Sequence, residues 1–179
     1  MSGDTVSPVI QDVFLVLQPF IASHTGLDPS LVIQGLPNRT AMPLASPGFV
    51  AMTVLRQMRL RTNLDNYDTT NPAPTSISIE QGIELDVQID CYGASSGDWA
   101  AILTTILRDD VGCQALAPTC QPLYCDDARM IQLIDSEDQY ELRFSFSACL
   151  QYNPVVTIPM KFADTLTADL INVQVTYPP

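Results

Sequence analysis

Residues 83–92 alternate strictly between apolar and polar side chains, and this pattern limits the fold more than any other feature of the chain. Successive side chains of a β-strand point to opposite faces, so the pattern predicts a strand with one face on a core. We extend this strand back to residue 77. The apolar set is Ile83, Leu85, Val87, Ile89 and Cys91, and the other set is Glu84, Asp86, Gln88, Asp90 and Tyr92.

A second strand is predicted over residues 49–61, where the even positions are apolar except for Arg56. Residues 62–76, rich in Asn, Asp, Thr and Pro, separate the two strands and exceed the usual hairpin loop of about 2–5 residues. We therefore expect a long β-hairpin arm over about residues 49–92, with a polar tip suited to interaction. Joining the two apolar faces requires paired residue numbers with an odd sum, which sets Arg59 or Arg61 against Glu80 or Glu84.

Two helices are predicted from apolar side chains spaced three and four residues apart. The first has its apolar face over residues 9–21, with Ser7 as N-cap, Pro8 at the first helical position, an end or kink at Pro19 and an exit at Gly26. The second covers residues 96–111, from an N-cap at Ser96 to a stop at Gly112. Its apolar face is Trp99, Ile102, Leu103, Ile106 and Leu107, which we expect to pack on Leu85, Val87, Ile89, Leu142, Phe144 or Phe146.

The remaining chain adds strands at residues 129–134, 140–152 and 170–177, with loops over residues 27–48 and 113–128. The predicted fold class is α+β: an antiparallel sheet of about five strands with two helices packed on one face and a long β-hairpin. At 179 residues, the chain has the length of a single domain over residues 1–179, because domains usually hold about 100–200 residues.

Charge and cysteine content exclude several classes of protein. The chain has 8 basic and 20 acidic residues, a net charge of −12, which argues against a protein that grips DNA phosphates. It still allows a surface that DNA slides past. No stretch approaches the roughly 18 apolar residues of a membrane span, and the start lacks the basic region of a signal peptide. Five cysteines, an odd number, favour free thiols in a reducing cytoplasm over a secreted disulfide scaffold.

No constellation of catalytic residues stands out. His24 is the only histidine, and neither a nucleophile elbow nor a phosphate-binding glycine loop is present. Cys113, Cys120 and Cys125 are spaced too irregularly for a typical zinc site. Two acidic pairs, Asp109-Asp110 and Asp126-Asp127, suit a solvated surface, and they also keep open a metal-dependent enzyme. We expect no enzymatic activity, no cofactor and no metal.

A series of segments, read in order over residues 9–164, resembles the neck and tail-terminator proteins of contractile-tailed bacteriophages. The series includes Gly48-Phe49-Val50-Ala51-Met52-Thr53, Gln88-Ile89-Asp90-Cys91-Tyr92-Gly93, Leu107-Arg108-Asp109, Pro122-Leu123-Tyr124-Cys125-Asp126-Asp127-Ala128-Arg129, Gln139-Tyr140-Glu141-Leu142-Arg143, Tyr152-Asn153-Pro154, Ile158-Pro159 and Phe162-Ala163-Asp164.

This resemblance implies a non-enzymatic virion protein that assembles as a ring, most simply a hexamer, at the head-proximal end of the tail. It implies the tail tube protein, the tail sheath protein and the head–tail connector proteins as neighbours, with genomic DNA passing through unbound. It also implies a location in the virion neck, with assembly in the host cytoplasm. Other head-completion or minor tail morphogenesis proteins, and a secreted adhesion domain, are the alternatives.

The hairpin supplies the candidate site residues. Its length predicts that Arg56, Arg59, Arg61, Asp65 and Tyr67 contact a neighbouring subunit. Residues 62–106 contain no Lys or Arg but seven acids, and three of these, Glu84, Asp86 and Asp90, are predicted to line the lumen of the ring. The alternative for these three acids is a solvated sheet face.

Overall fold

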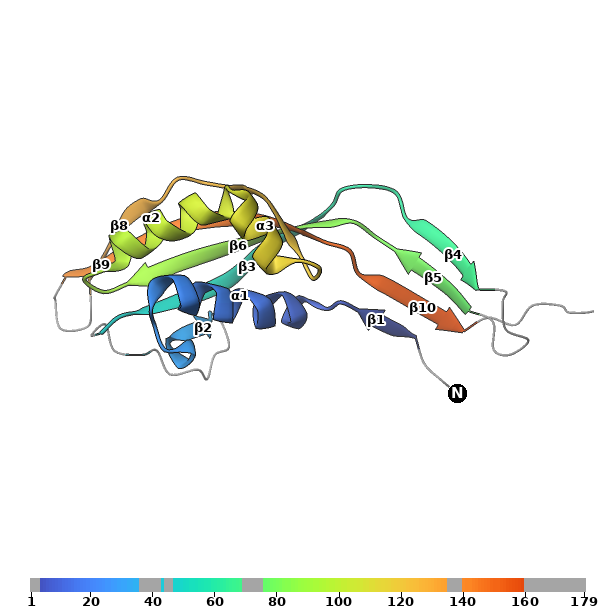
Figure 1. Ribbon diagram of the computed structural model, residues 1–179, viewed down its shortest axis with the longest axis horizontal. Helices are drawn as coiled ribbons and strands as arrows, with labels where there is room; N and C mark the ends of the chain where they lie inside the picture. The colour runs from blue at the N-terminus through green and yellow to red at the C-terminus, as the bar shows by residue number, and fades with distance from the viewer. Residues whose placement is uncertain (1–3, 36–42, 44–46, 69–75, 135–139, 160–179) are drawn as a thin grey trace, which may run out of the picture.

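The computed structural model describes residues 4–35, 43, 47–68, 76–134 and 140–159. Figure 1 shows a long molecule with two β-sheets, one under the helices and one extending away from them. The larger sheet, here called the body sheet, has the strand order β2-β3-β6-β9-β7, and β8 also pairs with β9. Its strands are β2 (Val32–Gln34), β3 (Phe49–Arg59), β6 (Ile83–Tyr92), β7 (Gln121–Cys125), β8 (Arg129–Ile134) and β9 (Tyr140–Tyr152).

The smaller sheet, here called the arm, continues three of the body strands outward (Figure 1). Its strands are β1 (Thr5–Ser7), β4 (Leu64–Asp68), β5 (Ser76–Glu80) and β10 (Val155–Pro159), in the order β1-β10-β5-β4. Strand β3 runs into β4, β5 runs into β6, and β9 runs into β10. The long hairpin is therefore shared between two sheets.

The mixed α+β class is confirmed, but the expectation of one sheet of about five strands is wrong. The described residues form one sheet of four strands and one of six. Strand β10 (Val155–Pro159) is not among the strands predicted from the sequence. Pro159 is the last residue of this strand and Pro154 precedes it, so neither interrupts the pairing from within. The predicted strand at residues 170–177 lies outside the described residues.

Helix α1 (Ile10–Thr25) ends at Gly26 as predicted, but it differs from the prediction at its start and at Pro19. Its N-cap is Val9, whose amide donates to the Asp12 carboxylate at 2.7 Å, while Ser7 pairs with Val155 in the arm. The helix continues through Pro19 to Gly26, which takes a left-handed φ of 72°. A proline in a helix costs about 3 kcal/mol. Burial of the next residues, Phe20 and Ile21, offsets that cost.

The second predicted helix is two helices, α2 (Ser96–Leu107) and α3 (Asp110–Leu116). Asp109 begins α3 because its carboxylate accepts a hydrogen bond from the Val111 amide at 3.2 Å. Gly112 lies inside α3 and does not end a helix. A Cβ at this position would come within 2.7 Å of the Ile106 carbonyl oxygen, so only glycine lets α3 approach α2 this closely.

The main core lies between the three helices and one face of the body sheet. Trp99, Leu103 and Leu107 are buried there with Leu85 and Phe146, as predicted. Two predicted members of this contact are wrong, because Ile102 and Leu142 are largely exposed. A smaller cluster of Phe49, Ala51 and Tyr92 lies on the opposite face of the sheet.

The register of β3 on β6 follows the odd-sum rule from Phe49↔Tyr92 to Val54↔Val87, where the numbers add to 141. A β-bulge then shifts the pairing by one residue, so that Arg56 lies opposite Asp86. Beyond the bulge the odd positions of β3 fall on the helix side. Arg56, the exception in the alternating pattern, therefore points to the polar face.

Candidate subunit interface and carboxylate cluster

All five predicted interface residues lie along one margin of the molecule. Arg56 and Arg59 belong to β3, Arg61 follows it, and Asp65 and Tyr67 belong to β4. We call residues 53–68 the arm edge. Strand β2 pairs with β3 only as far as Met52, and β4 is the last strand of the arm sheet, so no described strand pairs with the outer side of this edge. All five predicted residues are exposed in the subunit.

Two of the arginines form ion pairs across the hairpin. Arg61 binds Glu80, which is one of the pairings that the register argument allows. Arg56 donates from Nε to Asp86 at 2.8 Å and from Nη2 to Glu84 at 3.2 Å. Arg59 forms no ion pair within the described part of the chain. The arm edge therefore presents three guanidinium groups, of which those of Arg56 and Arg61 are already neutralised by carboxylates of the same subunit.

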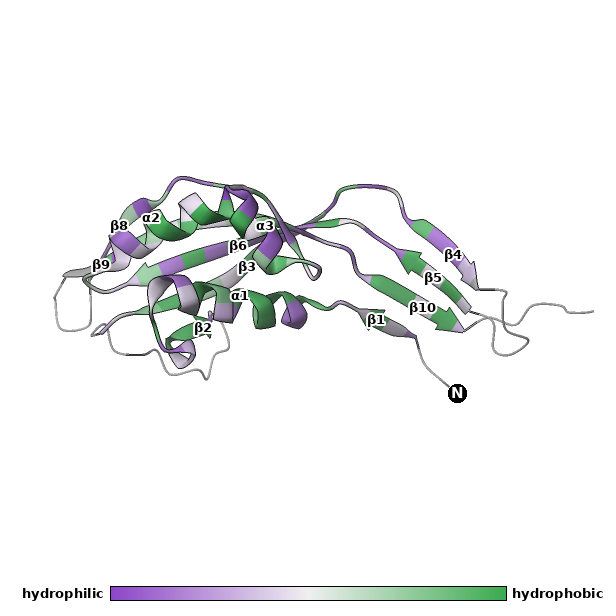
Figure 2. Ribbon diagram, viewed as in Figure 1, coloured by the Kyte–Doolittle hydropathy of each residue, from purple (hydrophilic) through white to green (hydrophobic). Residues whose placement is uncertain are grey.

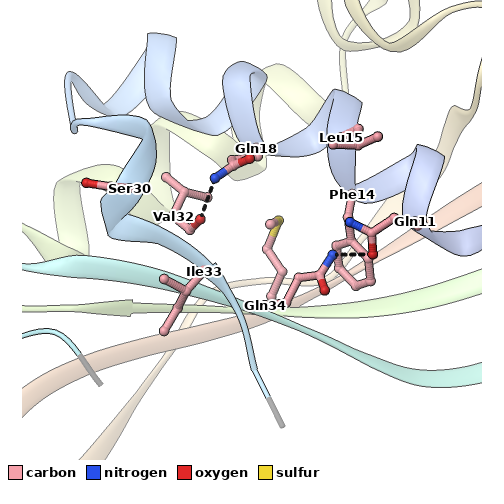
Figure 3. Close-up of a pocket in the computed structure, with 9 residues that line it drawn as sticks. Gln11, Phe14, Leu15, Gln18, Ser30, Val32, Ile33 and Gln34 are labelled. Carbon is pink, nitrogen blue, oxygen red and sulfur yellow. Dashed lines mark hydrogen bonds between the residues drawn. The ribbon is translucent and has the colours of Figure 1, made fainter. Parts of the chain in front are cut away.

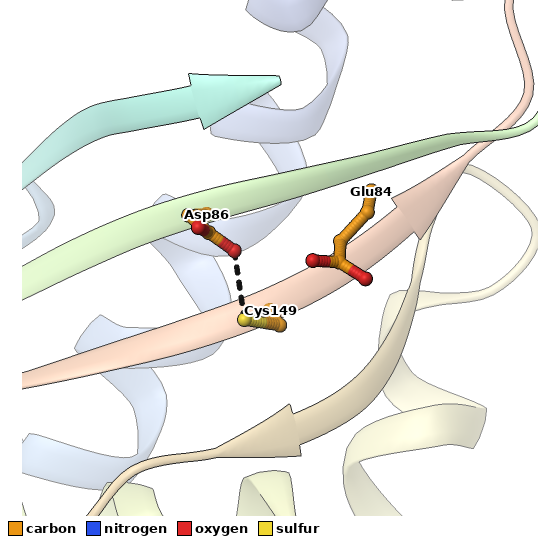
Figure 4. Close-up of side chains that lie close together, drawn as sticks. All are labelled: Glu84, Asp86 and Cys149. Atoms are coloured by element: carbon orange, nitrogen blue, oxygen red, sulfur yellow. Dashed lines mark hydrogen bonds between the residues drawn. The ribbon is translucent and has the colours of Figure 1, made fainter. Parts of the chain in front are cut away.

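Glu84 and Asp86 lie beside Cys149 on the polar face of the body sheet (Figure 4). Their potential ligand atoms are within 4.8 Å of one another. The Cys149 thiol donates to Asp86 Oδ1 at 2.8 Å, and burial together with this bond raises its pKa to about 12. A protonated thiol is a poor metal ligand, and the Glu84 and Asp86 carboxylates already form ion pairs with Arg56. The arrangement is better described as a cross-strand hydrogen-bond network than as a metal centre.

Asp90 lies deeper on the same face and has its own cation. Only 4% of Asp90 is exposed, and Arg143 Nη2 lies 3.0 Å from its Oδ1. The guanidinium carbon of Arg143 lies 5.4 Å from the centre of the Tyr92 ring. That ring stacks in turn on Phe49, with centroids 4.4 Å apart. A buried carboxylate, a cation and two aromatic rings thus stabilise this end of the polar face.

This geometry bears on the predicted lumen residues. Glu84, Asp86 and Asp90 share the polar face of β6, but all three are paired with Arg56 or Arg143. Three carboxylates and two guanidinium groups leave one net negative charge in the network. Glu84 and Asp90 are buried in the isolated subunit, and Asp86 is half-buried. A lumen position for these acids stays a prediction.

The candidate residues for enzyme chemistry have local structural roles. Asp109 caps α3, Asp110 accepts a hydrogen bond from Gln114, and Asp127 binds Arg108, which lowers its pKa. The His24 ring packs edge-on against Phe20, with centroids 4.8 Å apart. Cys113 is half-buried on α3, whereas Cys120 and Cys125 are buried. All five cysteines are free thiols, as the odd number predicts.

A cavity of about 320 Å³ opens between α1 and β2 (Figure 3). Its polar groups are largely satisfied within the chain. The Gln18 side-chain amide donates to the carbonyls of Pro29 and Val32 at 2.8 and 3.1 Å, and that of Gln34 donates to Gln11 at 3.1 Å. Its described lining has no ionisable side chain, so it offers no group for acid–base or metal chemistry.

The sequence did not reveal the apolar face of the arm. The register places six apolar side chains on one face, in the rows Val6–Val156–Ile79 and Tyr67–Ile77–Ile158. In Figure 2 much of β5 and β10 has the colour of hydrophobic residues. The β-branched run in β10 carried a signal for this strand, but it is only five residues long and is bounded by prolines.

Among the described helices, none combines the length and the hydrophobicity that crossing a membrane requires. A family model described as phage neck terminator protein matches residues 11–178 of the chain. The chain matches none of the curated proteins closely enough to count as a relative.

Proposed function

Because this chain belongs to the phage neck terminator family, we propose that it forms a ring at the head-proximal end of a phage tail, where it ends the tail tube and joins it to the neck. Membership itself gives the chain a structural role in the neck of the virion. The ring, its joining to the tube and a contractile tail are our extension of that role. In this proposal residues 1–179 act as one terminator-like domain without enzymatic activity.

The observation that carries the proposal is the arm. Of the six apolar side chains on its one face, Val6 and Tyr67 are exposed, Ile79, Val156 and Ile158 are half-buried, and Ile77 is buried. In Figure 1 the three helices lie over the body sheet, and no described helix lies over the arm. An antiparallel sheet with one apolar face ordinarily packs that face on a core, and a thin sheet alone has little stability in water. A subunit that extends such a sheet into solvent is suited to bury it against another protein.

Copies of the same chain are the simplest partners for the arm. A contact between two different surfaces of identical subunits generates a ring when the rotation closes. By family resemblance we expect six subunits. Each contact should bury at least about 1,000 Å² in total to be stable. We place Arg56, Arg59, Arg61, Asp65 and Tyr67 in this contact.

The remaining partners follow from the position of the ring. One face would meet the tail tube protein and the other the head–tail connector proteins, with the tail sheath protein outside. The net charge of −12 suits a channel that DNA crosses without binding. We assign the protein to the virion neck, after assembly in the host cytoplasm.

A nonsense mutation in the gene, in a phage that encodes this chain, tests the proposal. We expect filled heads and tails that fail to join, and we expect joining to be restored when purified protein is added to the mutant extract. Another head-completion or minor tail protein is the alternative. Joined particles that fail only at infection would identify a minor tail protein, and heads that leak DNA beside finished tails would identify a head-completion protein.

A further inference from the structure

We infer that the arm edge, residues 53–68, is a strand-acceptor site that pairs through its backbone with a second copy of this chain. The inference deepens the proposed ring and rests on it, because it specifies which margin of one subunit receives the next and by which chemistry. The recognition is main-chain hydrogen bonding at an open sheet edge, a mode in which backbone pairing supplies affinity and side chains supply register.

The edge is made of two strand segments. It includes residues 53–59 of β3, beyond the pairing with β2, and the whole of β4, so it spans both sheets; residues 60–63 between them form no strand. The two segments would reach roughly 23 Å and roughly 16 Å at about 3.3 Å per residue. Folded proteins usually shorten or block such edges with Lys, Pro, bulges or covering loops. Residues 53–68 contain no Lys and no Pro, and the one blocking device that the pairing shows is the bulge between Val54 and Arg56.

Large apolar side chains accompany the open backbone. Five of them are more than 40% exposed in the subunit, whereas the apolar residues at the start of β3, Phe49 to Met52, are buried. Exposed apolar side chains grouped along a sheet edge are typical of a surface that is buried against another protein. The set is Leu55, Met58, Leu60, Leu64 and Tyr67.

Charge selects a second copy as the occupant. Arg56, Arg59 and Arg61 supply three of the eight basic residues of a chain that carries twenty acids. Residues 53–68 also hold two aspartates, and Arg56 and Arg61 are paired with carboxylates of their own subunit. Arg59 forms no ion pair within the described residues, so its guanidinium is the cation of the edge that another copy's predominantly acidic surface can meet. The favoured contact is head-to-tail, between the arm edge of one copy and a different surface of the next, which is the type of contact that closes into a ring.

One position allows the backbone to be tested separately from the side chain. The Leu60 amide donates inward to the Gly82 carbonyl at 2.9 Å. Amides of successive residues in an extended strand point to opposite edges, so the Arg59 amide points outward. Arg59→Pro removes this outward donor without removing an internal hydrogen bond, because proline lacks the amide hydrogen and is tolerated at such edge positions. Arg59→Ala removes the same charge and keeps the donor.

The experiment compares wild type, Arg59→Pro and Arg59→Ala by size-exclusion chromatography with light scattering, and circular dichroism verifies the fold of each. We expect a ring for wild type, at least a tenfold loss of assembly for Arg59→Pro and a smaller loss for Arg59→Ala. If Arg59→Pro still forms the wild-type ring, the acceptor edge is wrong and the proposed ring stands. A wild type that is monomeric at every concentration contradicts both.

Hydrogen exchange of the wild-type protein gives a result that does not depend on any variant. The outward-pointing amides within residues 53–68, such as that of Arg59, should exchange quickly in the diluted subunit and at least tenfold more slowly in the ring. Equal exchange rates in both states would overturn the inference. Slow exchange in the diluted subunit would also overturn it, because the edge would then be covered by its own chain.

Discussion

Arg56 lies opposite Asp86 in the β3–β6 ladder, with its Nε 2.8 Å from the Asp86 Oδ2, because the pairing shifts by one residue between Val54 and Arg56. Without the shift, the odd-sum register would set Arg56 against Leu85, which is fully buried on the helix side. The bulge thus moves a guanidinium group from the core face to the carboxylate face. It also leaves Leu55 exposed on the arm edge.

The ion pairs on the polar face differ in burial, and we predict that their energetic contributions differ accordingly. Arg143→Gln leaves Asp90, only 4% exposed, without its cation, and should lower the free energy of unfolding by about 3 kcal/mol. Arg61→Gln breaks a more exposed pair with Glu80 and should cost less than about 1 kcal/mol. Urea denaturation of both variants measures the difference. Equal losses would show that Asp90 does not depend on Arg143.

Leu103 and Ile102 are neighbours on α2 with opposite environments, which makes them a matched pair. Leu103 is fully buried, so Leu103→Ala should lower the free energy of unfolding by roughly 2–5 kcal/mol. Ile102 is 40% exposed, and Ile102→Ala should cost distinctly less. The measurement is again denaturant unfolding. A loss under about 1 kcal/mol for Leu103→Ala would place α2 away from the core.

Buried thiols predict a loss of stability at alkaline pH. Burial, with a smaller contribution from Asp90, raises the pKa of Cys91 from its ordinary value of 9.0 to about 12. Between these values the unfolded chain releases a proton that the folded chain keeps, so this stabilisation is complete below pH 9 and declines as pH rises toward 12. The free energy of unfolding should fall by at most about 1.4 kcal/mol per pH unit for this thiol.

Urea unfolding at pH 8 and pH 10.5 tests this dependence, with Cys91→Ala as the control. The variant should lose less stability than wild type between the two pH values. Burial also raises the pKa of Cys120 and Cys125 to about 11, so some decline should persist in the variant. Identical losses in both proteins would show that Cys91 does not contribute to the pH dependence.

The lumen prediction requires a milder substitution than charge reversal. Lysine at positions 84, 86 and 90 would set cations against Arg56 and Arg143, so it would disturb the fold along with any effect on DNA. Asp86 has the most exposed side chain of the three acids, at 16%. If it faces the lumen, Asp86→Asn should slow DNA ejection at low salt and less at high salt, because screening weakens the lost repulsion. Unchanged ejection from correctly assembled particles would contradict the lumen position and leave Asp86 with a structural role only, in its ion pair with Arg56.

Alternation of side chains was enough to predict the hairpin, the helix-bearing face of β6 and the register from Phe49 to Val54. Long, regular elements can be predicted because the alternation of apolar and polar side chains recurs along the whole element and indicates the same buried face each time. The five residues predicted for the subunit contact also lie on one edge, as their place in the hairpin suggested. Their contact with another subunit is the prediction that the assembly experiments test.

Other features depend on contacts that a local pattern does not encode. The shift before Arg56 moves one residue out of the alternation, and a single exception in a strand does not identify a bulge. Strands β1 and β10 are three and five residues long; β10 is held by pairing with β5 along its whole length, and β1 by pairing with β10. Pro19 remains helical because Phe20 and Ile21 are buried against the core, a tertiary effect that overrides the local preference.

Cryo-electron microscopy of intact particles tests the central claim most directly, by locating this chain along the tail axis. The account predicts a closed ring of copies between the end of the tail tube and the head–tail connector, with the arm edge of each subunit against its neighbour. A chain found elsewhere in the particle, or found at the neck without lateral contacts through the arm, would contradict it.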